Sequence, residues 1–188
     1  MRKDLPRIIP ALREPARWTA LPEPSGAAWV FVLGGTLSTV GDLVPRLRRR
    51  GWRVFVHVDM IRGLNPDREG LRFLAAYAGP DGIITTHSGI VSHAKKCGLV
   101  CVQRIFLLDS QSVATGIQQV RAAAPDAVET LPGVIPEVLA RVSREVPCPV
   151  IAGGLITRLE QVRLALAAGA QSISTSTEAL WTLDGWDP

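Results

Sequence analysis

The sequence predicts an α/β protein, a compact (β/α)8 TIM barrel with parallel strands and short loops. Eight short runs rich in apolar and β-branched residues recur along the 188 residues, and segments with helical apolar spacing separate most of them. The runs are almost continuously apolar, which is typical of parallel strands covered on both faces. An open doubly wound sheet meets the same criteria, but the count of eight favours the closed barrel.

Each expected strand can be placed on the sequence by its apolar run. The runs span residues 7–12, 28–35, 53–60, 82–87, 99–109, 127–133, 149–155 and 172–176. Barrels of this kind typically run to about 250 residues, so the first unit is expected to be abbreviated, with only a partial helix in the Pro-rich segment 13–27.

The helices are expected where apolar residues recur every three or four positions. Such stripes cover residues 40–47, 71–78, 113–124 and 135–142. Thr157 with Glu160 resembles a capping box and predicts the start of a further helix. Pro45 predicts that the first helix begins near residue 41 or 42, because first-turn N–H groups have no intrahelical partner.

Length and composition predict one soluble domain spanning residues 1–188. A chain that is 47% hydrophobic can bury one sizeable core. Its apolar runs are too short to cross a membrane, and its start lacks the apolar core of a secretory signal, so we expect a cytoplasmic protein with no membrane partner. The cysteines Cys97, Cys101 and Cys148 show no metal-ligand spacing and are expected to be reduced. We expect neither a metal nor a cofactor.

The stretch "IAGGLITRLEQVRLALAAGAQSISTS" is the strongest candidate for a binding site. The loops after the seventh and eighth strands of such barrels often hold a phosphate. Glycines allow the backbone to approach an anion closely, and hydroxyls with N–H groups before a short helix in "TEALW" supply donors. Alternatively, the glycines serve tight packing and the hydroxyls are strand and cap residues. The candidate phosphate ligands are Gly153, Gly154, Ser174, Thr175 and Ser176.

Further polar residues are expected at the carboxyl ends of the strands, where barrel sites lie. Period-2 alternation in "VFVHVDM" turns His57 and Asp59 inward and the valines outward. The same reasoning reaches Glu129, and Arg13 and Arg104 could balance a phosphate or carboxylate. Arg104 could equally be an interior partner of Glu129. There is no nucleophile elbow, metal-ligand spacing or P-loop, so the site is better equipped to bind than to react, and we expect no enzyme.

The net charge of +4 and the pI near 9.4 favour an anionic partner. Much of the excess lies in "RLRRRG", where cations either complement the end of a helix or contact RNA. The chain shows no RNP aromatic pair, KH loop or OB pattern. If RNA is bound, the expected backbone contacts are Arg48, Arg49, Arg50, Lys95 and Lys96.

The motifs "IIPALR", "VFVHVDMIRGL", "VQRIFLLDS", "PDAVETLPGVIP", "IAGGLITRLEQVRLALAAGA" and "SISTSTEALW" occur in this order between about residues 8 and 181. Together they closely resemble the glycerol-3-phosphate-responsive antiterminator family of bacteria. The resemblance implies a regulator that senses glycerol 3-phosphate and acts on the leader mRNA of glycerol-utilisation genes, preventing premature termination. It implies that the ligand hydroxyls meet His57, Asp59 or Glu129. In this family a basic residue commonly follows the Ser-Thr of the fourth strand, and here "TTH" places His87 at that position, a departure from the family's pattern.

Two other functions are compatible with these residues. The first is a phosphate-binding barrel enzyme acting on a small phosphorylated metabolite such as glycerol phosphate, with Asp59 and Glu129 as acid and base. The second is a barrel that only senses or sequesters a metabolite. A homo-oligomer is compatible with each of the three functions.

Overall fold

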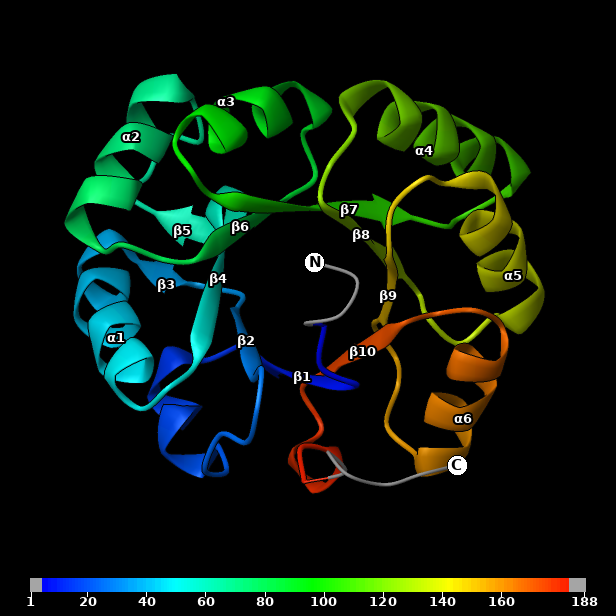
Figure 1. Ribbon diagram of the computed structural model, residues 1–188, viewed down its shortest axis with the longest axis horizontal. Coiled ribbons are helices and arrows are strands. Elements are labelled where there is room, and N and C mark those ends of the chain that lie inside the picture. Colours follow the sequence, from blue (N-terminus) through cyan, green and yellow to red (C-terminus); the bar gives the residue numbers. More distant parts are fainter. Residues whose placement is uncertain (1–4, 183–188) are drawn as a thin grey trace.

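The computed structural model describes residues 5–182, in which eight parallel strands close into a barrel (Figure 1). The order around the barrel is β1-β10-β9-β8-β7-β6-β4-β2, so the first and last strands meet. Each predicted strand forms one of the eight, and the predicted (β/α)8 TIM barrel is confirmed. The strands are β1 (Ile8–Leu12), β2 (Trp29–Val32), β4 (Arg53–His57), β6 (Gly82–Thr85), β7 (Val100–Phe106), β8 (Ala127–Leu131), β9 (Val150–Gly153) and β10 (Ser172–Thr175). Two short strands, β3 (Gly35–Thr36) and β5 (Ile61–Arg62), pair beyond the ends of β2 and β4.

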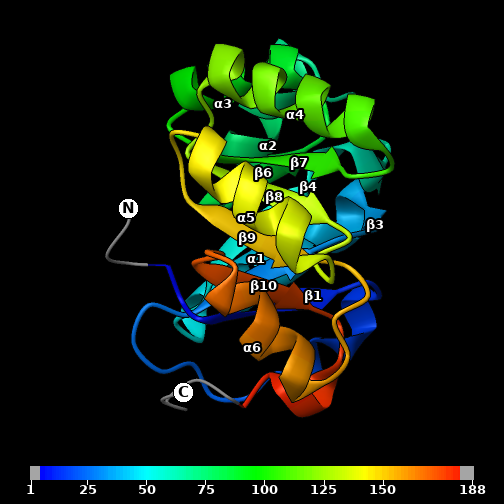
Figure 2. The same cartoon turned by 90° about the vertical axis from the view of Figure 1, so that its right-hand side faces the viewer.

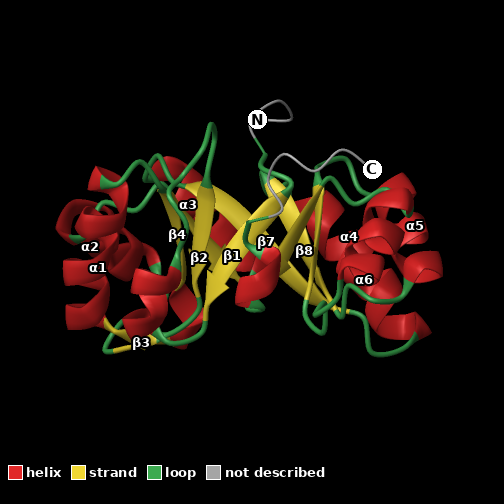
Figure 3. Ribbon diagram, turned by 90° about the horizontal axis from the view of Figure 1, so that it is seen from below, coloured by secondary structure: helices red, strands yellow, loops and turns green. Residues whose placement is uncertain are grey.

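Six α-helices of the described residues surround the barrel, with α1–α3 on one side and α4–α6 on the other (Figure 3). They are α1 (Leu37–Arg49), α2 (Arg68–Tyr77), α3 (Val91–Lys96), α4 (Ser110–Ala123), α5 (Pro136–Glu145) and α6 (Leu159–Ala167). Figure 2 shows α5 and α6 lying across the outside of β8, β9 and β10. No helix in the described part of the chain is long and apolar enough to cross a membrane.

Single 3-10 segments replace the α-helix in the first and last units of the barrel. The segments are η1 (Pro15–Ala20) after β1 and η4 (Glu178–Leu180) after β10, with η2 (Val58–Met60) and η3 (Ser88–Ile90) elsewhere. The abbreviated first unit predicted from the sequence is therefore confirmed. Trp181 follows η4, is 4% exposed, and donates its indole N–H to the Thr175 carbonyl at 2.8 Å. Its ring packs into the apolar layer of the first strands and helices.

Two helix starts differ from the prediction. Thr36 caps α1 by accepting the N–H of Thr39 at 3.1 Å, so the helix begins at Leu37 and Pro45 lies in its interior. The packing of the apolar face outweighs the lost backbone hydrogen bond. The Thr157–Glu160 box is wrong, because α6 is capped at Arg158 and the side-chain oxygen of Gln161 accepts two preceding backbone N–H groups at 2.8 and 3.1 Å.

Side chains fill the barrel interior. The rings of Trp29 and Phe55 stack with centroids 4.1 Å apart, and Phe31 lies against Phe55 at 5.7 Å. Val54 and Val56 of β4 point outward into the layer beneath the helices, as the alternation predicts. The barrel is a packed core, so a ligand can enter only from its ends.

The outer layer consists of two apolar clusters. One lies between α1–α3 and the first strands, and Trp181 from the end of the chain joins it. The other lies between α4–α6 and the later strands, and Ile8 from the start of the chain joins it. The half built from the first strands thus includes Trp181 from the last unit, and the half built from the later strands includes Ile8 from the first strand.

Candidate functional site at the barrel mouth

A cavity of about 560 Å³ opens at the carboxyl ends of the strands. Arg13 follows β1 at its rim, while Arg104, Glu129 and Ser174 reach it from β7, β8 and β10. The segments 154–157 and 174–177, at the carboxyl ends of β9 and β10, complete the wall of the cavity. This volume lies within the range of small-molecule sites, and the position is the one at which barrels of this class bind ligands.

A buried ion pair forms the floor of the cavity. Arg104 Nε donates to Glu129 Oε2 at 2.7 Å, and their side chains are 8% and 1% exposed. The Ser174 hydroxyl donates to the other carboxylate oxygen at 2.5 Å. The interior pairing considered from the sequence is confirmed. The pair carries no net charge, so the floor offers hydrogen-bonding groups without attracting or repelling an ion.

Gly153 makes room for this network. A Cβ at that position would lie 2.5 Å from Ser174 Oγ and 2.7 Å from Glu129 Oε1, closer than atoms pack. Gly153 is buried beneath the cavity and is absent from its lining. The structure therefore gives Gly153 the packing role that the sequence left open.

The backbone after β9 takes an unusual path along the cavity wall. Gly154 has a φ of 72° and Leu155 a φ of 62°, and the Leu155 side chain is 70% exposed. A left-handed leucine is unfavourable, and such residues cluster at sites where function requires the local shape. The turn brings the main chain of residues 154–157 to the cavity.

The three hydroxyls at the end of β10 have different tasks. Ser174 bonds to Glu129, and buried Thr175 donates to the Ile156 carbonyl at 2.7 Å, which ties the β9 loop to β10. Ser176 is exposed and lines the cavity, and no hydrogen-bond partner of its side chain occurs within residues 5–182. Ser176 is therefore the hydroxyl of this trio that is available to a ligand.

Arg13 is the unpaired cation at the rim. It lines both the main cavity and an adjoining pocket of about 180 Å³ that also contains Ser176. Its neighbour Arg17 forms an ion pair with Glu178, whereas Arg13 has no carboxylate partner within the described range. The Arg13 guanidinium is therefore available to an anion at the rim, although Glu14 and the Arg17–Glu178 pair also line the adjoining pocket.

His57 and Asp59 lie outside the cavity lining. Strand β4 ends at His57, which is 2% exposed, and the alternation does not extend to Asp59, which lies in η2. Burial, and then the charge of Arg104, lower the pKa of His57 to about 4. Its ring is therefore neutral near pH 7, and Nδ1 lacks a hydrogen-bond partner among the described residues.

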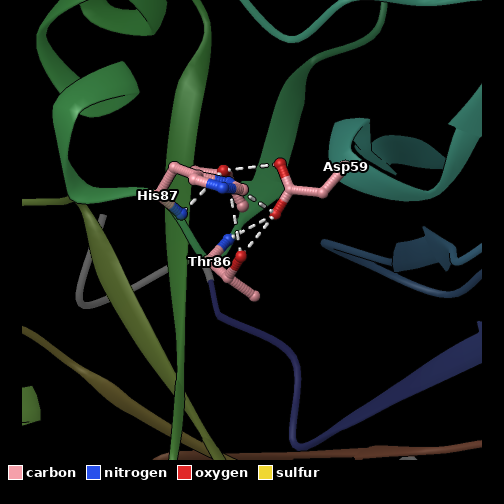
Figure 4. A network of polar contacts seen from close by, with 4 residues as sticks. Asp59, Thr86 and His87 are labelled. Atoms are coloured by element: carbon pink, nitrogen blue, oxygen red, sulfur yellow. Dashed lines mark hydrogen bonds and ion pairs between the residues drawn. The ribbon is translucent and has the colours of Figure 1, made fainter.

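Asp59 instead ties the end of β4 to the end of β6 (Figure 4). Its carboxylate accepts the Thr85 hydroxyl at 2.8 Å, the Thr86 N–H at 2.7 Å and the Thr86 hydroxyl at 2.8 Å. Burial opposes ionisation, but these hydrogen bonds outweigh it and lower the pKa of Asp59. His87, exposed on the same turn, lies 3.3 Å from the carboxylate.

The five cations predicted to meet RNA lie at helix ends opposite the mouth, because the helices run antiparallel to the strands. Arg48 bonds to the Gly79 carbonyl at 2.8 Å, Arg50 pairs with Glu23 at 2.8 Å, and Lys95 lies 3.7 Å from Asp126. Arg49 and Lys96 are exposed. Three of the five predicted residues thus already have internal partners.

Comparison with known proteins identifies the family. The family model described as glycerol-3-phosphate responsive antiterminator matches residues 8–181. The chain belongs to this family. The structure of the glycerol uptake operon antiterminator regulatory protein from Listeria monocytogenes str. 4b F2365 is 32% identical, with a TM-score of 0.85 over 93% of this chain and 94% of that one.

Two further proteins support the family assignment. A glycerol uptake operon antiterminator-related protein from Thermotoga maritima MSB8 is 36% identical, with a TM-score of 0.83 over 94% of this chain and 98% of that one. The uncharacterized protein YgcP of Escherichia coli K12 is 35% identical over 85% of this chain and 83% of its own length. The resemblance stated from the sequence motifs is confirmed, and the antiterminator family supports a regulatory role.

The geometry does not favour the enzyme alternative. Asp59 and Glu129, its expected acid and base, lie on different elements, and each carboxylate is held by hydrogen bonds to neighbouring side chains. Burial raises the pKa of the Cys101 thiol to about 12, so it is not a nucleophile. Within residues 5–182, the antiterminator barrel thus presents a pocket of fixed polar groups and no pair of groups arranged for proton transfer.

Proposed function

We propose that the mouth cavity binds glycerol 3-phosphate and that its occupancy controls contact with leader mRNA in the cytoplasm. One observation carries the ligand assignment. Arg13, which has no carboxylate partner within the described residues, lies at the rim of a cavity whose floor is the charge-balanced Arg104–Glu129 pair. Arg13 suits a phosphate, whereas the neutral Arg104–Glu129 pair suits an uncharged polyol. A ligand with an anionic and a hydroxylated end matches both.

The wall supplies the remaining phosphate donors. The Ser176 hydroxyl and the backbone of the Gly154 turn border the same cavity as Arg13. At the floor, Glu129 accepts one hydrogen bond on each oxygen and retains lone pairs for a glycerol hydroxyl. We place the phosphate at the rim and the hydroxyls at the floor.

Thermal unfolding with sn-glycerol 3-phosphate, glycerol and inorganic phosphate tests the ligand. At 100 times its dissociation constant a ligand adds about 2.7 kcal/mol to the stability of the folded state. We expect stabilisation by glycerol 3-phosphate alone, lost in Arg13→Gln and retained in Arg17→Gln, whose arginine is paired with Glu178. Equal stabilisation of both variants would remove Arg13 from the site, and no stabilisation of the wild type would reject the ligand.

The RNA half of the proposal is supported by the family and by the basic net charge. Coupling is reciprocal, so if glycerol 3-phosphate changes RNA affinity, RNA changes ligand affinity by the same factor. Titrating RNA with and without ligand measures this factor. A factor of one would favour a barrel that only senses or sequesters the metabolite, and product formed from glycerol phosphate would favour the enzyme.

A further inference from the structure

A basic groove of about 460 Å³ lies between α2 and α3, away from the mouth cavity. The two helices lie side by side in Figure 1 and pack against one another. Arg68 and Arg72 line the groove from α2, and His93 and Lys96 line it from α3. Three of these four side chains belong to permanently charged residue types, so the groove attracts anions.

The acidic residues near this groove offset little of its charge. Glu69 lies 3.4 Å from Arg72, but both side chains are more than half exposed, so the pair is weak. Asp67 is committed to the start of α2, where it accepts the Gly70 N–H at 2.8 Å. Lys96 is exposed and forms no ion pair within residues 5–182, whereas the neighbouring Lys95, also exposed, lies near Asp126.

An exposed aromatic pair lies on the same helix, on the side that faces α1, where Gly41 borders the Tyr77 ring. Phe73 and Tyr77 are 49% and 50% exposed, and their rings stack with centroids 5.1 Å apart and an interplanar angle of 19°. Phe73 follows the groove residue Arg72 directly in the sequence. Successive residues of a helix point about 100° apart, so a strand that contacts both the cations and the rings crosses the exposed face of α2.

The exposure of the two rings excludes a role in core packing. A glycine in the neighbouring helix α1 makes room for the Tyr77 ring. A Cβ on Gly41 of α1 would lie 2.3 Å from the Tyr77 ring. Glycine in a helix interior is less favourable than alanine. At Gly41 this weaker helix former leaves the space that the Tyr77 ring occupies.

We propose that this groove and aromatic pair bind single-stranded RNA. The RNA phosphates lie along Arg68, Arg72 and Lys96, and an unpaired base stacks on the outer face of the Phe73–Tyr77 pair. Cations that follow a backbone beside exposed rings are the arrangement by which proteins bind unpaired strands, whereas a duplex keeps its bases out of reach. The inference rests on the proposed antitermination function, because it states where the RNA of that function binds.

Fluorescence anisotropy with a labelled oligouridine of ~20 nucleotides tests the groove, with a duplex of equal length for comparison. The wild-type protein is measured with saturating sn-glycerol 3-phosphate and without it, over a range of salt concentrations. We expect the single strand to bind more tightly than the duplex. Arg72→Gln/Lys96→Gln should weaken binding about tenfold and flatten the slope of log K against log salt by about 1.4, or 0.7 per phosphate contact.

The aromatic contribution is separated from packing by variants that keep apolar bulk. Phe73→Leu/Tyr77→Leu should weaken binding about tenfold with an unchanged salt slope, while Tyr77→Phe should bind as the wild type does. Matched controls on the other side of the barrel are Arg141→Gln/Arg144→Gln in α5 and Leu164→Ala in α6, which should leave affinity unchanged. Far-ultraviolet circular dichroism verifies that each variant is folded.

The outcomes distinguish the groove from the function on which it rests. If wild-type protein binds the strand and the groove variants bind equally well, the groove is not the RNA site and the proposed function stands. If wild-type protein binds neither RNA with or without ligand, the groove is rejected as a site for single-stranded RNA, and the titration with leader mRNA decides the proposed function separately. If the duplex binds as tightly as the strand and the leucine variants lose nothing, stacking is rejected.

Discussion

Replacing Glu129 by glutamine should destabilise the protein by about 3 kcal/mol. The Glu129 side chain is 1% exposed and its partner Arg104 is 8% exposed at 2.7 Å, so the substitution leaves a guanidinium uncompensated inside the barrel. Removing one partner of a buried pair costs about 3–5 kcal/mol. The lower end applies because glutamine keeps the volume and one oxygen that can still accept from Arg104 or Ser174.

Urea unfolding followed by circular dichroism measures this loss, with Arg104→Met and the double variant Arg104→Met/Glu129→Gln as the other corners of a cycle. The double variant holds no buried charge, so it should be more stable than the sum of the two single losses predicts. For a chain of this size, 3 kcal/mol corresponds to a drop of about 6–12 °C in Tm. A loss below about 1 kcal/mol in Glu129→Gln, or strict additivity in the cycle, would refute the description of the floor as a desolvated ion pair.

Three further outcomes are expected. Gly153→Ala should destabilise the protein by about 1–3 kcal/mol through overlap with the Ser174 hydroxyl and the Glu129 carboxylate, and urea unfolding of Gly153→Ala/Ser174→Ala should show partial recovery. His57 has a pKa of about 4 when folded and about 6.5 when unfolded, so the unfolded state takes up the proton first and stability should fall by about 3 kcal/mol between pH 6.5 and 4. His57→Gln should remove that part of the pH dependence in unfolding titrations, whereas His93→Gln should retain it. Gly41→Ala should displace the Tyr77 ring and weaken oligouridine binding in the anisotropy assay. Unchanged affinity would show that RNA binding does not need the ring in its present position.

The barrel itself could be predicted because its strands are buried on both faces. The alternation in β4 placed Phe55 inside and Val54 and Val56 outside, and the structure agrees. Helix ends were less predictable. Thr36 directly follows the run expected at residues 28–35, and its role as a cap was missed because Pro45 moved the expected helix start to residue 41 or 42. The six residues of α3 are too few to show a helical period.

The site could be predicted in outline and less well in its details. The segments around Gly154 and Ser176 do border the cavity, because the ends of β9 and β10 converge there. Asp59 does not, since the chain leaves the strand one residue after His57 and turns the carboxylate to the end of β6. The basic groove takes its residues from two helices, and Gly41, which makes room for the Tyr77 ring, lies on a third helix. No single stretch of sequence therefore reveals them.

The placement of Trp181 and Ile8, each in the half of the barrel farther from it in sequence, affects when the barrel can close during synthesis. Trp181 completes the apolar layer of the first half, and Ile8 belongs to that of the second. Strand β1 also cannot form its pairing with β10 until residues 173–175 are available. During synthesis, therefore, the early strands can collapse but cannot close, and the emerging chain carries an open edge until β10 has left the ribosome. Closure waits for β10, and a chain cut before residue 173 would keep the edge of β1 unpaired.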